Sequence, residues 1–192
     1  MLADDAFLYH LHRGTELLLQ ERVDEARQSL EQALRLQPED IEGQSLLAAV
    51  YFRLGLYQRA IESWLDLAER YPQSATLHVN LALSWLKCGD FERAVAAAEQ
   101  ALAQQPEHRR AWRYAGLAHW RLGHLEEAKH ALTQADAHQL IAHIEAERLA
   151  ASHPGAAGDA DASAPIAAAS PQDLGLAAAQ AEAQLRDWPS PL

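Results

Sequence analysis

Apolar residues recur along this chain with a period of 34 residues. Alanine stands at four positions separated by this interval, and a larger apolar residue precedes each alanine by three positions. The alanines are Ala26, Ala60, Ala94 and Ala128, and the larger residues are Val23, Tyr57, Phe91 and Leu125. The sequence between them is rich in Ala, Leu, Glu, Gln and Arg, which all favour helix. The pattern therefore predicts helical units that follow one another along the chain.

Two kinds of helix-ending residue share this period. They are Gly55, Gly89 and Gly123, and Pro38, Pro72 and Pro106. Each glycine is predicted to lie where the first helix of a unit stops and the chain turns, because glycine tolerates a positive φ. Each proline is predicted to end the second helix, because proline cannot continue a helix interior. Each unit is therefore expected to be a pair of antiparallel helices.

These residues resemble the tetratricopeptide repeat over most of the chain. The second unit carries Leu47-Ala48, Tyr51, Gly55, Ala60, Trp64 and Pro72. The third carries Leu81-Ala82, Trp85, Gly89, Ala94, Ala98, Ala101 and Pro106. The fourth carries Trp112, Ala115-Gly116, His119, Gly123, Ala128, Leu132 and Ala135, and the first carries Gly14, Leu17, Ala26, Leu30, Ala33 and Pro38. The tryptophans and alanines at helical spacing are expected to lie in the core.

The resemblance implies an all-α solenoid in which four helix-turn-helix repeats stack into a right-handed superhelix. The expected repeats span residues 7–40, 41–74, 75–108 and 109–140, inside a repeat domain of residues 1–151. Three residues depart from the pattern. In the first repeat, Glu21 replaces the turn glycine and Arg13 stands where leucine is usual, and in the fourth repeat Leu140 replaces the last proline. We therefore expect the chain to follow a different path after Ala135.

The last repeat of a solenoid exposes an apolar side unless another element covers it. Leu140, Ile141, Ile144 and Arg148 share one helical face, so we predict a capping helix over residues 137–150. Residues 152–171 contain Gly, Pro, Ser, Asp and Ala without a period. That composition is typical of a flexible linker.

Residues 172–192 are predicted to form a short amphipathic C-terminal helix and tail. Leu174, Ala178, Ala181, Leu185 and Trp188 follow a 4-3-4-3 spacing, which places them on one stripe. Such a stripe is a candidate docking segment, with Leu174, Leu185 and Trp188 as its contacts. Three alternatives stay open, namely a tail that touches nothing stable, docking in the groove of its own chain, and docking on a partner.

In this family the concave surface is lined by the first helix of each repeat, so the resemblance implies a groove that binds a partner. The expected lining in the first two repeats is Leu8, Leu11, Leu18, Leu46 and Phe52. In the last two repeats it is Asn80, Leu83, Lys87, Arg110, Arg113, Tyr114, Leu117, Trp120 and Arg121. Long apolar side chains facing such a groove indicate that something covers them, and Arg and aromatic residues are enriched at interface hot spots. Alternatively, the leucines pack against a neighbouring unit or a second protomer, and the arginines are solvated surface.

Chaperone-binding members of the family hold a C-terminal carboxylate with a clamp of Lys, Asn and Arg side chains. The matching positions here are Ser45, Ala49, Asn80, Arg110 and Tyr114. Only Asn80 and Arg110 fit, so a carboxylate clamp is not expected.

Charge and composition narrow the class of partner. The formal net charge of −11 argues against nucleic acid, because phosphate binding needs positive charge. The sequence holds no run of about 18 apolar residues, so no membrane span is expected. Its start, MLADDAF, lacks the basic and apolar regions of a secretory signal. The lone cysteine, Cys88, excludes a disulfide framework and is expected to be a buried or half-buried filler. We therefore predict a cytoplasmic protein.

The residues that carry enzyme chemistry form no pattern in this sequence. None of the ten histidines is spaced three or four residues from another, as two metal ligands on one helix require. The phosphate-binding, dinucleotide, HExxH and GxSxG motifs are absent from the sequence. We therefore predict no catalytic residues, no metal site, no cofactor and no enzyme activity.

The leading hypothesis is an adaptor or scaffold that binds a peptide or helix of another protein in its groove. One alternative is a chaperone that shields secreted or assembly subunits in a bacterium. Another is a self-assembling structural component, in which Leu8, Leu11 and Leu18 or the 174–188 stripe contact a second copy.

Overall fold

The computed structural model describes residues 2–152, and every regular element in this part of the chain is a helix. The helices are α1 (Leu2–Leu19), α2 (Val23–Leu36), α3 (Ile41–Arg53), α4 (Tyr57–Arg70), α5 (Ala75–Cys88), α6 (Phe91–Gln104), α7 (Arg109–Arg121), α8 (Leu125–Gln134) and α9 (His138–Ser152). The chain divides into two units, Met1–Leu149 and Ala150–Leu192. The tail contacts predicted at Leu174, Leu185 and Trp188 lie outside the described residues.

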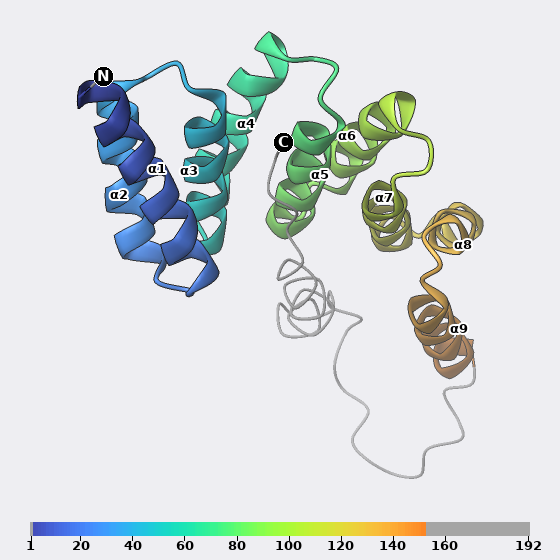
Figure 1. The fold of residues 1–192 in the computed structure, drawn as a ribbon. Coiled ribbons are helices and arrows are strands. Elements are labelled where there is room, and N and C mark those ends of the chain that lie inside the picture. The colour runs from blue at the N-terminus through green and yellow to red at the C-terminus, as the bar shows by residue number, and fades with distance from the viewer. Residues whose placement is uncertain (1, 153–192) are drawn as a thin grey trace. The chain divides into compact units, whose positions relative to one another are not determined.

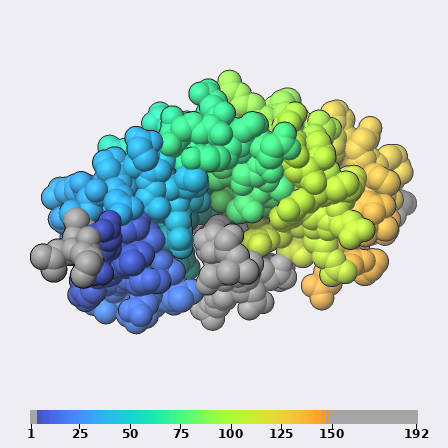
Figure 2. Space-filling model, turned by 45° about the horizontal axis from the view of Figure 1, so that its top comes forward, coloured from blue at the N-terminus to red at the C-terminus, as the bar shows by residue number. Residues whose placement is uncertain are grey.

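Helices α1 to α8 form four consecutive helix-turn-helix pairs that stack in chain order (Figure 1). Each helix packs on the next one along the chain, from α1 on α2 through to α7 on α8. The colours in Figure 2 also follow chain order from one end of the first unit to the other. The all-α repeat fold predicted from the 34-residue period is therefore confirmed.

The turn glycines adopt the conformation that their position predicts. Gly55, Gly89 and Gly123 have φ of 74°, 78° and 81°. At the first of these turns the amide of Leu56 donates to the carbonyl of Tyr51 at 2.9 Å. The amide of Gly55 donates to the carbonyl of Phe52 at 3.0 Å, and this pair of bonds is the Schellman motif that satisfies the last carbonyls of a helix.

Glu21 forms the same turn without glycine. Its φ is 61°, and the amide of Arg22 donates to the carbonyl of Leu17 at 2.9 Å. A left-handed conformation places the Cβ atom of a non-glycine residue close to the following carbonyl. The first turn of the stack therefore carries a local cost that the other turns avoid.

The last pair ends in a different way from the others, as the missing proline suggests. Helices α2, α4 and α6 are each followed by a C-cap residue that precedes a proline and has a φ between −130° and −135°. Helix α8 instead ends early, at Gln134, and Asp136 takes a φ of 53°. The amide of Ala137 donates to the carbonyl of Leu132 at 2.9 Å, so α8 ends with the turn used elsewhere by the first helix of a pair.

Small residues let the two helices of a pair approach closely. Ala26, Ala60, Ala94 and Ala128 are all fully buried. At the two ends of the stack the approach also depends on glycine, because a Cβ atom on Gly14 would lie 2.6 Å from Leu30. A Cβ atom on Gly116 would lie 2.7 Å from Leu132. These positions therefore admit no side chain without a shift of the neighbouring leucine.

Helix α9 covers the apolar side of the last pair. Ile144 is 2% exposed and clusters with Leu132 of α8, while Leu140 and Ile141 pack around this contact. Arg148, which the helical pattern places on the same face, is exposed. The side chains of α9 thus complete the core where no further repeat follows.

Candidate functional site

The candidate groove residues of the first two repeats lie mostly in the core. Leu11 and Leu18 of α1 cluster with the buried face of α2, as does Leu46 of α3. Phe52 packs on Trp64 of α4, with their ring centroids 6.2 Å apart. Among the apolar residues expected at this end, Leu8 alone stands well exposed, at 47% of its surface. These side chains fill the space between helices because they are apolar and lie on the faces where helices meet.

Most candidate residues of the last two repeats remain partly accessible, whereas Asn80 and Tyr114 are buried. Leu83 on α5 and Leu117 on α7 are half-buried and occupy equivalent positions one repeat apart. Trp120 is also half-buried, and its ring meets that of His143 on α9 at 6.2 Å. Leu83 and Leu117 pack against one core cluster and Trp120 against another, and we call these three partly accessible side chains of α5 and α7 the apolar strip.

Cationic side chains accompany this strip. Lys87, Arg110, Arg113 and Arg121 are all half-buried on the same two helices. The guanidinium of Arg121 lies over the ring of Phe91, 5.1 Å from its centroid, which holds that charge at the end of the strip. We name the set Leu83, Leu117, Trp120, Arg110, Arg113 and Arg121 the basic–apolar surface.

Tyr114 lies beneath the arginines and is 3% exposed. Burial raises the pKa of its phenol, while the nearby charges of Arg110 and Arg113 act in the opposite direction. The phenol therefore stays neutral, because burial disfavours its charged form. Tyr114 supports the basic–apolar surface from below and offers little contact area of its own.

Asn80 is 7% exposed, and its amide nitrogen makes no hydrogen bond within the described residues. Its backbone carbonyl accepts a hydrogen bond from the hydroxyl of Ser84 at 2.8 Å. A buried amide donor without a hydrogen-bond acceptor costs free energy.

Three features escaped the sequence interpretation. Arg53 donates to the carbonyl of Leu18 at 2.7 Å, and it stands 34 residues before Lys87, a period that could have revealed it. His119 and His124 bring their rings within 5.8 Å although they are five residues apart, because the turn at Gly123 folds one back toward the other. The expectation for Cys88 was wrong, since this cysteine is exposed next to the turn at Gly89.

The two histidines differ in their surroundings. Burial lowers the pKa of His119, and the charge of His124 lowers it further, whereas Glu127 and Glu99 act in the opposite direction.

Within residues 2–152, no group of three or more His, Cys, Asp or Glu side chains is arranged to hold a metal ion. No helix in that range has both the length and the hydropathy of a membrane span.

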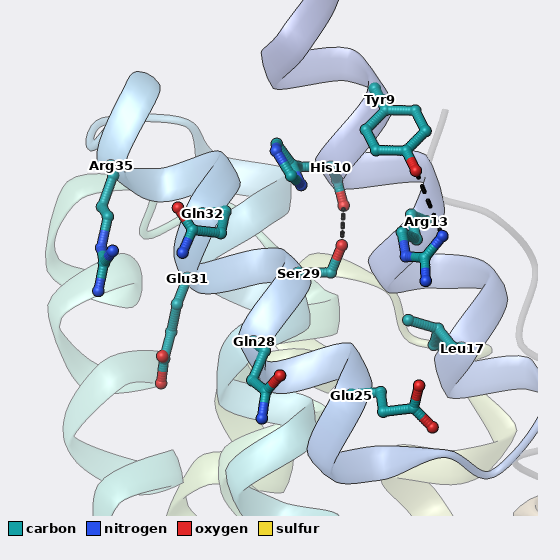
Figure 3. Close-up of a pocket in the computed structure, with 10 residues that line it drawn as sticks. All are labelled: Tyr9, His10, Arg13, Leu17, Glu25, Gln28, Ser29, Glu31, Gln32 and Arg35. Atoms are coloured by element: carbon teal, nitrogen blue, oxygen red, sulfur yellow. Dashed lines mark hydrogen bonds between the residues drawn. The ribbon is translucent and has the colours of Figure 1, made fainter.

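A hollow lies between α1 and α2, away from the basic–apolar surface. It has a volume of about 470 Å³, and most of its lining is polar (Figure 3). Arg13 donates to the hydroxyl of Tyr9 at 3.2 Å, and the hydroxyl of Ser29 donates to the carbonyl of His10 at 3.1 Å. We name this hollow the outer cleft. The sequence interpretation missed it because its residues come from two helices and follow no motif.

Stacked helix pairs with a small-residue interior and an exposed strip on their first helices define a helical-repeat binding protein. The tetratricopeptide repeat pattern matches residues 11–75 and 79–138, more than half of the chain. The chain belongs to the tetratricopeptide repeat family, whose repeats mediate protein–protein interactions.

Two curated relatives share part of this sequence. The chain is 29% identical over 102 residues to the Hsp70-Hsp90 organising protein of Plasmodium falciparum (isolate 3D7), a match that covers 50% of this chain and 18% of that protein. It is 31% identical over 103 residues to cellulose synthase operon protein C of Pseudomonas fluorescens (strain SBW25), covering 54% of this chain and 8% of that protein. The chain therefore spans less than a fifth of the length of either relative.

Solved structures of MamA share the fold. MamA from Desulfovibrio magneticus RS-1, residues 41 to the end, superposes with a TM-score of 0.68 at 22% identity, covering 78% of this chain and 91% of that chain. A further crystal structure of MamA gives a TM-score of 0.62 at 21% identity, covering 74% of this chain and 80% of that chain. At this level of sequence identity, the similarity shows only that the helices are arranged in the same way.

Proposed function

We propose that this protein is a non-catalytic adaptor that holds a segment of a partner protein against the basic–apolar surface. The observation that carries the proposal is the apolar strip of Leu83, Leu117 and Trp120 beside Arg110 and Arg113. An exposed strip of this kind gains free energy when a partner covers it. The partner segment that fits combines apolar side chains with carboxylates.

Charge supports this choice of partner. The whole chain carries a formal charge of −11, yet the groove positions of α5 and α7 carry Lys and Arg and no Asp or Glu. A positive patch on an acidic protein attracts acidic segments of a partner. These charges would set the orientation and the association rate more than the affinity. Affinity would come mainly from apolar burial, at roughly 25 cal/mol per Å².

The test is affinity capture with the full chain, followed by mass spectrometry. Partners captured by the natural sequence are compared with those captured by the double variant Arg110→Glu/Arg113→Glu. The expected result is loss of the specific partner, because both side chains become repulsive to carboxylates. Unchanged recovery, with helix content intact by circular dichroism, would remove the basic residues from the mechanism.

A matched control uses an arginine outside the surface. Arg148→Glu changes the net charge in the same direction on the exposed side of α9. It should leave partner recovery unchanged. Equal losses in the control and the double variant would instead show a general effect of charge and would contradict a defined binding surface.

The predicted docking role of residues 170–192 is tested in the same assay. If this segment occupies the groove of its own chain, a chain of residues 1–151 should bind the captured partner more tightly than the full chain. If the segment itself docks on the partner, the shorter chain should bind more weakly. Equal affinity would assign no binding role to Leu174, Leu185 and Trp188.

A further inference from the structure

The first helices of the last three repeats each carry a cationic side chain in their last turn. These side chains are Arg53 of α3, Lys87 of α5 and Arg121 of α7, which follow one another at 34-residue intervals. We name them the cation row. A cation is favourable in the last turn because the final carbonyls of a helix carry partial negative charge. That preference does not by itself require the row, since α1 has Leu19 at the equivalent position, with 69% of its surface exposed.

Contacts with neighbouring elements position two members of the cation row. Arg53 is exposed and donates to the carbonyl of Leu18, near the end of α1, at 2.7 Å. The guanidinium of Arg121 lies over the ring of Phe91. Both contacts leave N–H groups for a further acceptor, because a guanidinium carries five donors in its plane. Within the described residues, neither Arg53 nor Arg121 makes an ion pair.

An apolar row borders the cation row. Leu83 and Leu117 of the apolar strip have Ala49 of α3 as their equivalent one repeat earlier. All three side chains are half-buried, and each stands four residues before the cation of its own helix. Residues four apart lie on the same face of a helix, so each cation is one turn away from an apolar side chain. The accessible surface therefore continues onto α3, with a cation beside the apolar row on every helix.

The opposite edge of the apolar row carries a different set of side chains. Seven residues before the members of the apolar row stand Glu42, Thr76 and Arg110. They are a carboxylate, a hydroxyl and a guanidinium, so the charge on this edge changes sign between α3 and α7. Only the edge formed by the cation row is positive on all three helices, in a chain whose net charge is −11.

The spacing of the first helices limits which partner segment fits both rows. Packed helices lie about 8–10 Å apart, and α5 packs directly on α7. A helix rises about 1.5 Å per residue, so seven residues of a helix span about 10.5 Å. A partner helix that crosses the first helices would therefore place every seventh residue over the next helix, on one face of the partner.

We propose that the partner segment is an amphipathic helix that crosses α3, α5 and α7 and carries carboxylates along one flank of its apolar stripe. The stripe would cover the apolar row, and the carboxylates would pair with the cation row. This proposal rests on the proposed function and extends its surface to α3. Arg53, which lies outside the basic–apolar surface, thereby becomes a residue that selects the partner.

The probes are two fluorescently labelled synthetic peptides of equal composition. The first contains three copies of Leu-Ala-Gln-Leu-Glu-Gln-Ala, which places its glutamates on one flank of the leucine stripe. The second exchanges the fifth and sixth residues of each copy, which moves the glutamates to the face opposite the leucines. Fluorescence anisotropy with the full chain should show about tenfold tighter binding of the first peptide at about 0.15 M salt, where charges more than about 8 Å apart are largely screened. Equal affinity for the two peptides, or no binding of either, would overturn the proposal.

Substitution of Arg53 tests the cation row without changing the basic–apolar surface. Arg53→Glu should weaken binding of the first peptide about fivefold or more and leave that of the second within about twofold. Arg59→Glu is the matched control, because Arg59 is an exposed arginine of the same repeat whose guanidinium lies 5.9 Å from the centroid of the Tyr51 ring. It should leave both affinities within about twofold. Equal losses in the two variants, or none in Arg53→Glu, would contradict a role for the cation row.

Two milder variants separate the charge of Arg53 from its contact with the carbonyl of Leu18. Arg53→Gln keeps a hydrogen-bond donor but removes the charge, so it should still weaken binding of the first peptide. Arg53→Lys keeps the charge and should retain most of the affinity. Circular dichroism verifies that each variant keeps its helix content. Natural affinity in an intact Arg53→Gln variant would show that the charge does not contribute.

The proposed function is tested at Arg110 and Arg113, so the two proposals can fail separately. Loss of the captured partner in Arg110→Glu/Arg113→Glu, together with unchanged peptide binding in Arg53→Glu, would keep the adaptor role and reject the cation row. Unchanged capture in the double variant, together with weaker peptide binding in Arg53→Glu, would instead reject the arginines of α7 as partner contacts.

Discussion

The two ends of the repeat stack differ in how the outer face of the terminal helix pair is treated. At the C-terminal end of the stack, α9 covers the apolar face of the last pair, and Ile144 packs on Leu132. At the N-terminal end, the described residues add no covering helix, and polar side chains such as Tyr9 and Arg13 replace the apolar ones. Covering restores the buried area of an interior repeat, whereas a polar face removes the need for it. Within the described residues, one end of the stack is thus closed by packing, and the other presents polar side chains.

The largest expected loss of stability comes from a substitution at the C-terminal end of the stack, which α9 covers. Ile144→Ala removes a buried side chain and leaves a space above Leu132, so the free energy of unfolding should fall by about 2–4 kcal/mol. Urea denaturation followed by circular dichroism measures this loss. At the other end, truncation of the half-exposed Leu8 to alanine should cost less than about 0.5 kcal/mol. Similar losses at both ends would contradict the distinction between a packed and a solvated end.

The next prediction concerns the two terminal pairs, in which a glycine lets the two helices of the pair approach closely. Gly116→Ala drives a Cβ atom against Leu132 and also brings it 3.2 Å from the carbonyl of Ala128. Gly14→Ala meets side-chain atoms of Leu30 alone. We expect a net loss of about 1–3 kcal/mol for Gly116→Ala and a smaller one for Gly14→Ala, since a leucine can shift more easily than a backbone carbonyl. Thermal unfolding of both variants measures which of the two substitutions costs more stability.

A matched leucine variant sharpens this result. Gly116→Ala/Leu132→Val should recover part of the stability that Gly116→Ala loses, because the shorter side chain leaves room for the new methyl group. Strictly additive losses in the double variant would mean that the two positions do not compete for the same space.

A smaller effect is expected at the first turn, where a substitution should increase stability. Glu21→Gly relieves a left-handed φ of 61° and should stabilise the protein by about 0.5–1 kcal/mol. Gly55→Ala, which forces a Cβ atom into a φ of 74° with nothing else within 4 Å, should destabilise it by a similar amount. Thermal melts of both variants measure the two shifts. Destabilisation by Glu21→Gly would show that side-chain contacts of Glu21 outweigh the backbone cost.

The smallest effect is a pH dependence confined to the last pair. His108 caps α7 by accepting a hydrogen bond from the amide of Ala111 at 3.3 Å, which requires a neutral ring. Burial lowers the pKa of His108, and the charge of Arg110 lowers it further. The unfolded chain then binds more protons than the folded chain below about pH 6.5, so this contribution is present above that pH and is lost as the pH falls.

The measurement is the melting temperature between about pH 7.5 and 5.5, a window of about one unit on either side of the ordinary histidine pKa. His108→Asn keeps an N-cap acceptor but does not titrate, so it should flatten part of the pH dependence. An unchanged slope in this variant would remove His108 as a cause and leave His119, whose pKa burial also lowers.

Much of the architecture was predictable because it depends on local rules. Glycine at Gly55, Gly89 and Gly123 predicted the turns, since few residues tolerate a positive φ. The small residue Ala60 predicted a close helix contact for the same kind of steric reason. The lining of the groove was less predictable. Leu83 and Leu117 remain partly accessible, yet Leu11, which was also expected in the lining, is buried in the core.

The sequence by itself determined the helix pairs, their order and the turns between them, because these follow from residues close together in the chain. The tertiary structure alone decided which side chains of α1, α3, α5 and α7 stay accessible, that Cys88 is exposed, and that α8 stops early at Gln134. It also formed the outer cleft from residues of two helices. The reason is that the burial of a side chain depends on which helix packs over it, and the 34-residue period is the same whether or not a neighbour is present.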